Sequence, residues 1–426
     1  MPHLRRLRLV VATALGDLAG WASRRLHRGS GEVIAGRVIQ IVAPDALRQR
    51  LDGRPIAVIS GTNGKSTTTA LLAAAARTRG PVATNDKGAN MPAGILASVG
   101  HAPPRATAVI EVDEGYVPAL LAMTSIEVLV LLNLSRDQLD RVAEVRKTAE
   151  RWRQAIAASP ATTVVANADD PAVVFAARAA PLTVWVAAGS SWRVDATSCP
   201  NCGARIRFDA DDWRCTQCDL ARPVAQWSID RDGRLAVTGD DTVDLVVELA
   251  VPGRHNRTNA VMALAAAAAL GIPTRAALEA MQSIRAIEGR YDYVWGTGSS
   301  ARLYLSKNPA GWIEIIELLK RSPRRVLIVI NAEIADGKDT SWLWDVPFEA
   351  LSDKHVIASG RRCQDLAVRL YYAEVDVVTE PDLDRALTLA REGDCDVVAN
   401  YTAFRDVRRA VARAASGGAG TLGVAP

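Results

Sequence analysis

A glycine-rich stretch decides the fold, and it reads Gly61-Thr62-Asn63-Gly64-Lys65-Ser66-Thr67. An apolar run from Ile56 to Ile59 precedes it, and an Ala/Leu-rich helical pattern follows from about Ser66 to Arg77. A strand, a glycine turn and a helix in this order are the setting of a phosphate-binding loop. The position that commonly carries the first glycine is Ile59, so the stretch is a variant loop in which Gly61 makes the turn. The alternative is an ordinary glycine turn before a helix.

The residue types of this loop predict a nucleoside triphosphate and Mg²⁺ as ligands. Backbone N–H groups freed by the glycines turn toward phosphate oxygens, and the helix N-terminus adds positive potential. Lys65 is expected to bridge the β- and γ-phosphates, and Ser66 is expected to give its hydroxyl to Mg²⁺. A second metal ligand should come from the end of a neighbouring strand. Glu111 is the candidate, with Asp113 and Glu114 as alternatives.

The rest of the chain predicts an α/β protein of two or three domains in 426 residues. Strand-like runs at 106–112, 126–132, 162–166 and 182–186 alternate with helical patterns, which favours a mainly parallel sheet covered by helices. A Gly/Ser-rich stretch near 296–300 suggests a boundary, and further runs follow at 325–330, 355–358, 375–378 and 397–400. We expect an N-terminal helix and lead-in over 1–52, an ATP-binding central domain over 53–297, a C-terminal Rossmann-like α/β domain over 298–414, and a disordered tail over 415–426.

Charge and hydropathy exclude several classes of protein. The net charge is +4, from 51 basic and 47 acidic residues, which argues against nucleic-acid binding over the whole surface. No run approaches 18 apolar residues, as a membrane span would need. Arginines at 5, 6 and 8 precede an apolar run from Leu9 to Leu15 that Asp17 ends. This pattern favours a basic amphipathic helix, packed on the protein or touching anionic lipid, over a signal peptide.

Four of the six cysteines form two pairs, Cys199-x₂-Cys202 and Cys215-x₂-Cys218. Two close thiolate pairs are typical of a tetrahedral Zn²⁺ site, and four protein ligands leave no place for water, so the zinc is expected to be structural. The alternatives are two redox pairs or an iron–sulfur site. The segment, about 190–223, is expected to be a small inserted ribbon whose hairpin, Trp213 included, is solvated. A single cluster in a long chain also indicates a reducing, cytoplasmic compartment.

The phosphate loop, the Glu111 strand end, the segment 133–141 and the segment Gly253-Arg254-His255-Asn256-Arg257-Thr258-Asn259-Ala260 resemble the ATP-binding central domain of the Mur ligases. Those enzymes use ATP to convert a carboxylate into an acyl phosphate, which an amine attacks. The resemblance implies that residues 61–67 bind ATP, that Ser66 and Glu111 bind Mg²⁺, that Asn256 or Asn259 contacts the adenine, and that Arg290 reaches the nucleotide. The chain departs from the family at Gln138, where a histidine is usual, and Lys147 is no convincing counterpart of the lysine that several members carbamylate.

Only about fifty residues precede the loop, too few for a separate nucleotide-sugar-binding domain. With the cysteine ribbon and the segments Leu305–Gly311 and Asn331–Asp345, this resembles one branch of the family, the synthetase subunits of lipid II isoglutaminyl synthases. That branch amidates the α-carboxylate of D-glutamate in lipid II at the inner face of the membrane. It takes ammonia from a separate GatD-type glutamine amidotransferase subunit.

The five histidines form no glutaminase motif with Cys363 or Cys395, which agrees with a separate ammonia source. The resemblance implies that an acid of this chain orients the partner's catalytic histidine, and Asp339 is the first choice, Asp345 the second and Asp336 the third. Trp342 and Trp344 would be core residues or would anchor that interface. Two alternatives are an amino-acid-adding Mur or folylpolyglutamate-type ligase and a non-catalytic zinc-ribbon scaffold.

Overall fold

The computed structural model describes residues 2–26, 31–85, 89–136, 145–187, 189, 193–210, 212–238, 244–284, 291–293, 300–322, 324–333 and 336–417. The chain divides into two compact units. Unit 1 contains residues 1–135 and 143–285, and unit 2 contains residues 136–142 and 286–426.

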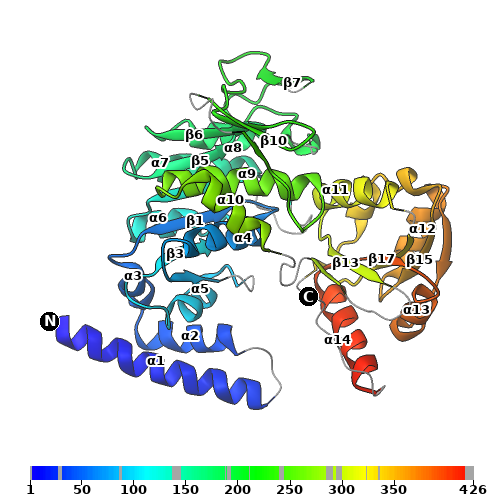
Figure 1. Cartoon of the computed structure of the whole chain (residues 1–426), viewed down its shortest axis with the longest axis horizontal. Helices are drawn as coiled ribbons and strands as arrows, with labels where there is room; N and C mark the ends of the chain where they lie inside the picture. Colours follow the sequence, from blue (N-terminus) through cyan, green and yellow to red (C-terminus); the bar gives the residue numbers. More distant parts are fainter. Residues whose placement is uncertain are drawn as a thin grey trace. The chain divides into compact units, whose positions relative to one another are not determined.

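Unit 1 is built on a nine-stranded sheet with the order β11-β10-β9-β6-β5-β4-β1-β3-β2 (Figure 1). The strands from β2 to β9 in this order are all parallel, and β10 and β11 add an antiparallel edge. Their bounds are β1 Ile56–Ser60, β2 Val82–Thr84, β3 Thr107–Glu111, β4 Val128–Leu131, β5 Thr163–Asn167, β6 Thr183–Ala187, β9 Trp227–Ile229, β10 Arg234–Val237 and β11 Leu245–Val246.

Helices cover both faces of this sheet. They are α1 Pro2–Arg25, α2 Glu32–Val42, α3 Ala46–Leu51, α4 Lys65–Arg77, α5 Pro92–Val99, α6 Val117–Met123, α7 Val145–Ala157, α8 Pro171–Ala177, α9 Arg254–Ala269 and α10 Thr274–Gln282. Successive strand residues point to opposite faces. Val58 and Ile110 therefore join the core under α2, α3 and α5 to α8, while Ile59 and Val109 join the core under α4, α9 and α10. Strands buried on both faces explain the nearly continuous apolar runs of the sequence.

The register of the central strands brings the ends of three strands together. Ile59 of β1 pairs with Glu111 at the end of β3, and Ser60 pairs with Leu131 at the end of β4. Parallel strands open their carboxyl ends at one edge of the sheet, where α/β proteins place their ligands. The loop after β1 therefore lies between the loops that follow β3 and β4.

The cysteine segment is a hairpin of β7, Ile206–Asp209, and β8, Asp212–Cys215. The prediction that Trp213 lies on a solvated face is wrong: its side chain is buried, and Nε1 donates to the carbonyl of Ala168, 3.0 Å away. Burial of this large aromatic ring against the α/β layers removes apolar surface from water and so stabilises the fold, and the indole N–H finds a hydrogen-bond partner there. Trp213 thus anchors the ribbon on the rest of unit 1.

Unit 2 holds a six-stranded sheet with the order β12-β13-β17-β14-β15-β16, parallel except at β12. Its strands are β12 Tyr291–Tyr293, β13 Ala301–Leu305, β14 Arg325–Val329, β15 His355–Ser359, β16 Asp376–Thr379 and β17 Cys395–Ala399. Its helices are α11 Pro309–Lys320, α12 Cys363–Tyr372, α13 Leu383–Ala390 and α14 Tyr401–Gly417, with short 3₁₀ turns at Ser341–Asp345 and Phe348–Leu351.

The predicted α/β fold class is confirmed, and the predicted strand runs coincide with β1, β3, β4, β5, β6, β14, β15, β16 and β17. The helix expected from Ser66 begins one residue earlier, at Lys65. Among the described helices, none combines the length and the apolar character that a membrane span requires.

Candidate functional site

The loop between β1 and α4 has the backbone of a phosphate-binding loop. Gly61 and Gly64 have φ angles of 145° and 87°, which only glycine adopts without strain. A Cβ at Gly61 would also lie 2.9 Å from the Cβ of Leu132, so the loop passes too close to the end of β4 for any side chain there. The α4 N-terminus follows at once and directs its free N–H groups toward the loop.

Lys65 is buried, and its ammonium group is held inside the loop. Its Nζ donates to the carbonyls of Gly61 and Thr62 and lies 2.9 Å from Oε1 of Glu114. The ion pair with Glu114 compensates a charge that would otherwise be costly to bury. Glu114, which the sequence offered as an alternative metal ligand, is thus the partner of the loop lysine.

Ser66 and Glu111 lie in direct contact. The hydroxyl of Ser66 donates to Oε2 of Glu111 at 2.7 Å, and both side chains are buried. Asn90 donates to the other carboxylate oxygen at 3.2 Å, and the Asn85 side chain pairs with both backbone groups of Glu111 at 2.8 Å. A carboxylate and a hydroxyl beside a phosphate loop are the oxygen ligands that Mg²⁺ takes.

The segment after β4 braces the loop. Asn133 accepts from the backbone N–H of Asn63 at 2.9 Å and donates to its carbonyl at 3.0 Å. Thr62 donates its hydroxyl to the Ser135 carbonyl and accepts from the Ser135 N–H, both at 3.0 Å. Sequence reasoning missed Asn133 as a site residue, although a polar residue directly after a buried strand was a usable signal.

Asp170 links the segment after β4 to the first turn of α8. One carboxylate oxygen caps α8 by accepting from the N–H groups of Ala172 and Val173, and the other accepts from the N–H of Leu134 at 2.8 Å. Burial raises the pKa of Asp170 to about 6, because it outweighs the lowering by the three backbone donors.

The two asparagines of α9 occupy different surroundings. Asn259 lies against the phosphate loop, because a Cβ on Gly64 would stand 2.5 Å from its Oδ1. Asn256 donates to the Pro252 carbonyl at 2.6 Å, within its own turn. Both side chains are buried. Arg290 and Gln138 lie outside the described residues, and Lys147 stands on α7.

The four cysteines of the ribbon come together. Their sulfur atoms all lie within 4.8 Å of one another, with 3.6 Å between Cys199 and Cys218 and 3.4 Å between Cys202 and Cys215. A tetrahedral ion with bonds of about 2.3 Å would separate its sulfur ligands by roughly 3.8 Å. The backbone N–H groups of Gln217 and Cys218 donate to the Cys215 sulfur and lower its pKa, whereas burial raises the pKa of Cys199. The donor set fits Zn²⁺.

In unit 2 the three candidate acids differ in what they contact. Asp336 is buried and accepts from the N–H and hydroxyl of Thr402 and from the N–H of Glu333, so its oxygens are committed within the unit. Asp339 is exposed. Its carboxylate accepts from the N–H of Ser341 at 2.8 Å, and this bond, with one from the Ser341 hydroxyl, lowers the pKa of Asp339. Asp345 is 42% exposed, with Nη2 of Arg136 at 3.9 Å.

Unit 2 also exposes aromatic side chains, and one of them, Trp344, directly precedes Asp345. Trp342 is buried, but Trp344 is largely exposed, and its ring lies tilted against that of Tyr372 with 5.6 Å between their centroids. Tyr372 in turn meets Tyr371 edge-on at 5.7 Å. All three rings sit at the surface of unit 2, over the first 3₁₀ turn and the end of α12. Such clusters are enriched at protein interfaces.

Comparison with known proteins agrees with both halves of this description. The family model of the Mur ligase middle domain matches residues 59–195, and that of the MurT ligase C-terminal domain matches residues 305–404. The solved pseudomurein peptide ligase type C from Methanothermus fervidus has a similar fold, with a TM-score of 0.66 at 20% identity over 85% of this chain and 79% of its own. The chain belongs to the Mur ligase family of enzymes.

Within that family, similarity over nearly the whole chain is to MurT subunits. The chain is 29% identical to the lipid II isoglutaminyl synthase (glutamine-hydrolyzing) subunit MurT of Streptococcus pneumoniae, over 94% of this chain and 97% of the relative. It is also 29% identical to the MurT subunit of Staphylococcus aureus, over 97% of this chain and the full length of that relative.

Proposed function

We propose that this chain is the ATP-dependent subunit of an enzyme that amidates lipid II in peptidoglycan synthesis, converting the α-carboxylate of its D-glutamate to D-isoglutamine at the inner face of the membrane. The observation that carries the proposal is the phosphate loop with Ser66 against Glu111, on a chain similar over nearly its whole length to MurT subunits.

The reaction we propose has two steps. A carboxylate oxygen of the acceptor attacks the γ-phosphorus of ATP, the bond to the bridging oxygen breaks, and ADP leaves. Ammonia then attacks the carbon of the acyl phosphate, phosphate leaves, and the nitrogen loses a proton. Phosphoryl transfer of this kind depends on positioning and on compensation of charge.

The residues of unit 1 supply that positioning. Lys65, whose ammonium already lies inside the loop, would neutralise phosphate charge, and Ser66 with Glu111 would hold Mg²⁺. Asn259, against Gly64, is placed to hold the loop, so of the two asparagines we assign the adenine contact to Asn256, and we keep Arg290 as a residue that reaches the nucleotide. The bound metal would offset the negative charge of the phosphates.

The loop assignment is tested with Lys65→Ala, which should abolish ATP-dependent amidation because no other cation of the loop can replace the ammonium. Lys147→Ala, on α7, is the matched control and should leave activity within a few-fold of the parent. Near-normal amidation by a folded Lys65→Ala protein would contradict the ATP-site assignment. Amidation exchanges OH for NH₂ and makes the product slightly lighter than the acceptor, so a product heavier by an amino-acid residue would indicate an amino-acid-adding ligase.

We also propose that a GatD-type glutaminase supplies the ammonia and docks on unit 2 near Asp339. The support is an exposed carboxylate whose pKa is lowered by hydrogen bonds from Ser341, on a unit that also exposes the rings of Trp344, Tyr371 and Tyr372. An ionised acid is what orients and stabilises a catalytic imidazolium in Cys–His systems.

Asp339→Asn separates this role from carboxylate activation. Glutamine-dependent amidation should fall by about 10³-fold or more, while amidation from added ammonium salt survives. Asp345→Asn is the control: it removes the same charge six residues after Asp339 and should leave glutamine-dependent amidation close to that of the parent. Loss of both activities in Asp339→Asn would place this residue at the acceptor site, and an unchanged variant would transfer the role to Asp345.

A further inference from the structure

The N-terminal helix α1 is apolar on the face that it turns to solvent. Six large side chains are each 44–64% exposed: Leu7, Val10, Val11, Leu15, Leu18 and Trp21. Their spacing of three, four and seven places them along one side of the helix. On a surface helix of a globular protein, the face turned to solvent carries charged and polar residues, and the apolar face is turned to the core.

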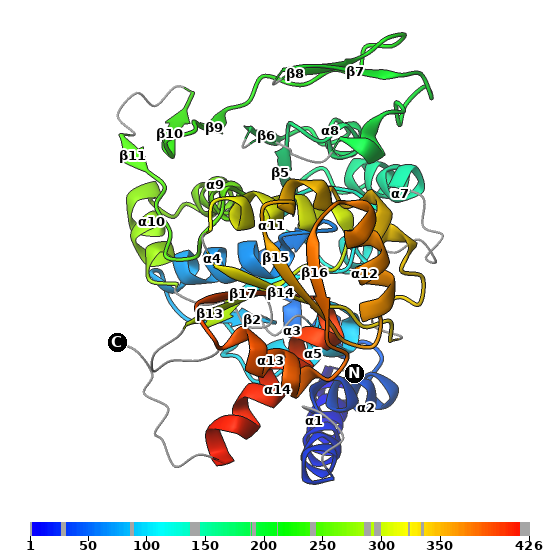
Figure 2. The same ribbon diagram turned by 90° about the vertical axis from the view of Figure 1, so that its right-hand side faces the viewer.

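The buried face of α1 carries small residues instead, chiefly Ala12, Gly16 and Gly20. A Cβ at Gly16 would stand 2.6 Å from the Ile39 side chain, and one at Gly20 would stand 3.1 Å from the Gly31 carbonyl. The helix therefore packs on α2 through its backbone, and α2 packs on α5 in turn. In Figures 1 and 2, α1 is the outermost layer of unit 1 on this side. The large side chains are not needed for this packing.

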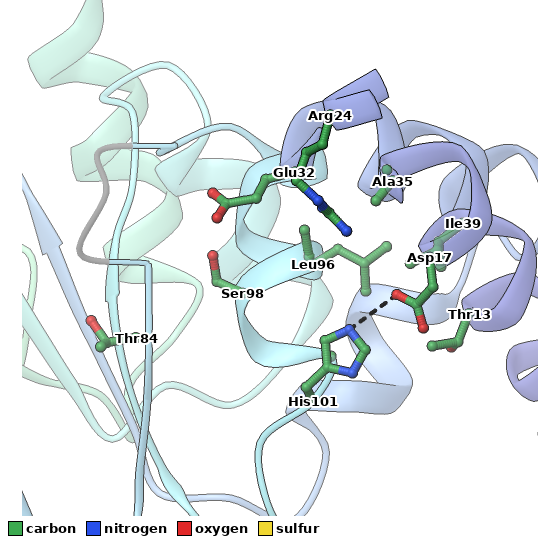
Figure 3. Close-up of a pocket in the computed structure, with 13 residues that line it drawn as sticks. Thr13, Asp17, Arg24, Glu32, Ala35, Ile39, Thr84, Leu96, Ser98 and His101 are labelled. Atoms are coloured by element: carbon green, nitrogen blue, oxygen red, sulfur yellow. Dashed lines mark hydrogen bonds and ion pairs between the residues drawn. The ribbon is translucent and has the colours of Figure 1, made fainter. Parts of the chain in front are cut away.

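Three polar side chains of α1, Thr13, Asp17 and Arg24, lie along one flank of the helix (Figure 3). Asp17 reaches His101, 3.1 Å away, and both line a cavity of about 360 Å³ between α1, α2 and α5, together with Thr13 and Arg24 (Figure 3). Asp17 is the one acidic residue in the sequence of α1, which has five arginines. The apolar face thus has no acid on it, and basic residues stand at both ends of the helix.

We propose that α1 is a membrane-docking helix that lies along an anionic bilayer with Leu7, Leu18 and Trp21 in the acyl boundary, held there in part by the attraction of the basic ends of its sequence to the headgroups. This surface deepens the proposed function, because the proposed acceptor is lipid-linked. Apolar burial and attraction to anionic lipid act together in helices of this type, and tryptophan favours the membrane interface.

Charge distinguishes this occupant from a second copy of the chain. Two copies of α1 packed face to face would bring arginines together in either orientation, since arginines lie at both ends. Like charges at close range oppose that contact, whereas phosphate headgroups compensate the same arginines. The face is therefore complementary to an anionic surface and not to itself.

The test is co-sedimentation of the full chain with vesicles rich in phosphatidylglycerol or made of phosphatidylcholine alone. The parent should bind the anionic vesicles more tightly, and added salt should weaken this binding. Leu18→Glu/Trp21→Glu should bind at least about tenfold more weakly, because two large apolar side chains leave the lipid. The matched control is Leu182→Glu/Val224→Glu, which adds the same charge at positions 57% and 85% exposed near β6 and β9, at the opposite part of the sheet.

A second readout does not depend on a disruptive variant. Lipids brominated in their acyl chains should quench part of the protein fluorescence, and Trp21→Phe should remove that quenching while binding persists. Equal binding of Leu18→Glu/Trp21→Glu and parent, an equal loss in the control, or no binding by the parent would each overturn the inference. So would a concentration-dependent dimer that these two substitutions abolish, since a second copy would then be the occupant.

These outcomes are separate from those of the proposed function. Vesicle binding through α1 by a protein that amidates nothing would refute the proposed function and leave the membrane surface intact. Amidation of a detergent-solubilised acceptor by a protein that binds no vesicles would do the reverse.

Discussion

The brace between Asn133 and the phosphate loop gives the sharpest prediction. Asn133→Ala removes two hydrogen bonds to the backbone of Asn63, of 2.9 and 3.0 Å. At about 1 kcal/mol net for each bond, the loop loses about 2 kcal/mol of support. If this support maintains the conformation that binds phosphate, affinity for ATP falls by about 30-fold.

Asn167→Ala is a matched control from the end of the adjacent strand. Asn167 also makes two side-chain bonds to backbone, donating to Leu132 and accepting from Asp169, both at 2.9 Å. It makes neither of them to the loop. Both variants should lower the melting temperature of unit 1 by several degrees, since each loses a similar number of bonds.

The assay is equilibrium binding of a fluorescent ATP analogue, with thermal unfolding followed on the same samples. We expect weaker nucleotide binding in Asn133→Ala alone. Equal losses of affinity in the two variants, or unchanged affinity in Asn133→Ala, would refute the reasoning that this brace preorganises the loop.

Three further predictions concern stability. The chain should carry about one zinc ion, and Cys215→Ser should lower both zinc content and melting temperature; full zinc in that variant would contradict a four-cysteine site. Burial raises the pKa of Asp170 to about 6 in the folded state, above its ordinary 3.8, so the folded state binds this proton more tightly. The free energy of unfolding should therefore rise by about 2 kcal/mol through this group as the pH falls from 7 to 4. The slope of stability against pH should flatten in Asp170→Asn. Gly36→Ala should cost about 3 kcal/mol in unfolding measurements, since its Cβ would stand 1.8 Å from the Ala93 carbonyl, whereas Gly393→Ala meets no neighbour within 4 Å and should cost little.

The phosphate loop is a feature that local sequence alone predicts. Glycines at positions 61 and 64, an apolar run before them and a helix pattern after them are all local, and local rules predict the strand, the loop and the helix that the structure contains. The Cys-x₂-Cys pairs are equally local, because each pair positions two sulfurs by the geometry of one short turn. The choice of Glu111 needed only the rule that parallel strands end at one edge, and the register of β1 with β3 puts it beside Ser66.

Other features depended on contacts between distant segments. Glu114 pairs with Lys65 across 49 positions, Asn133 reaches Asn63 across 70, and Trp213 reaches Ala168 across 45. The order of residues along the chain does not show which polar groups will bond to one another, because the packing of the layers determines which of them come into contact. The same holds for the acids of unit 2, where burial separates Asp336 from the exposed Asp339.

The sequence by itself therefore determined the fold class, the phosphate loop and the cysteine cluster, since each follows from residues within one turn or one strand–loop–helix unit. Only the tertiary structure decided how the loop is braced, which carboxylates are free to meet a partner, and which face of α1 is turned outward. Between its basic ends, the sequence of α1 has two faces without charge, one of large apolar side chains and one of small residues. Gly16 and Gly20 let α2 approach the face of small residues. That close approach buries the side with small residues and leaves the large side chains at the surface.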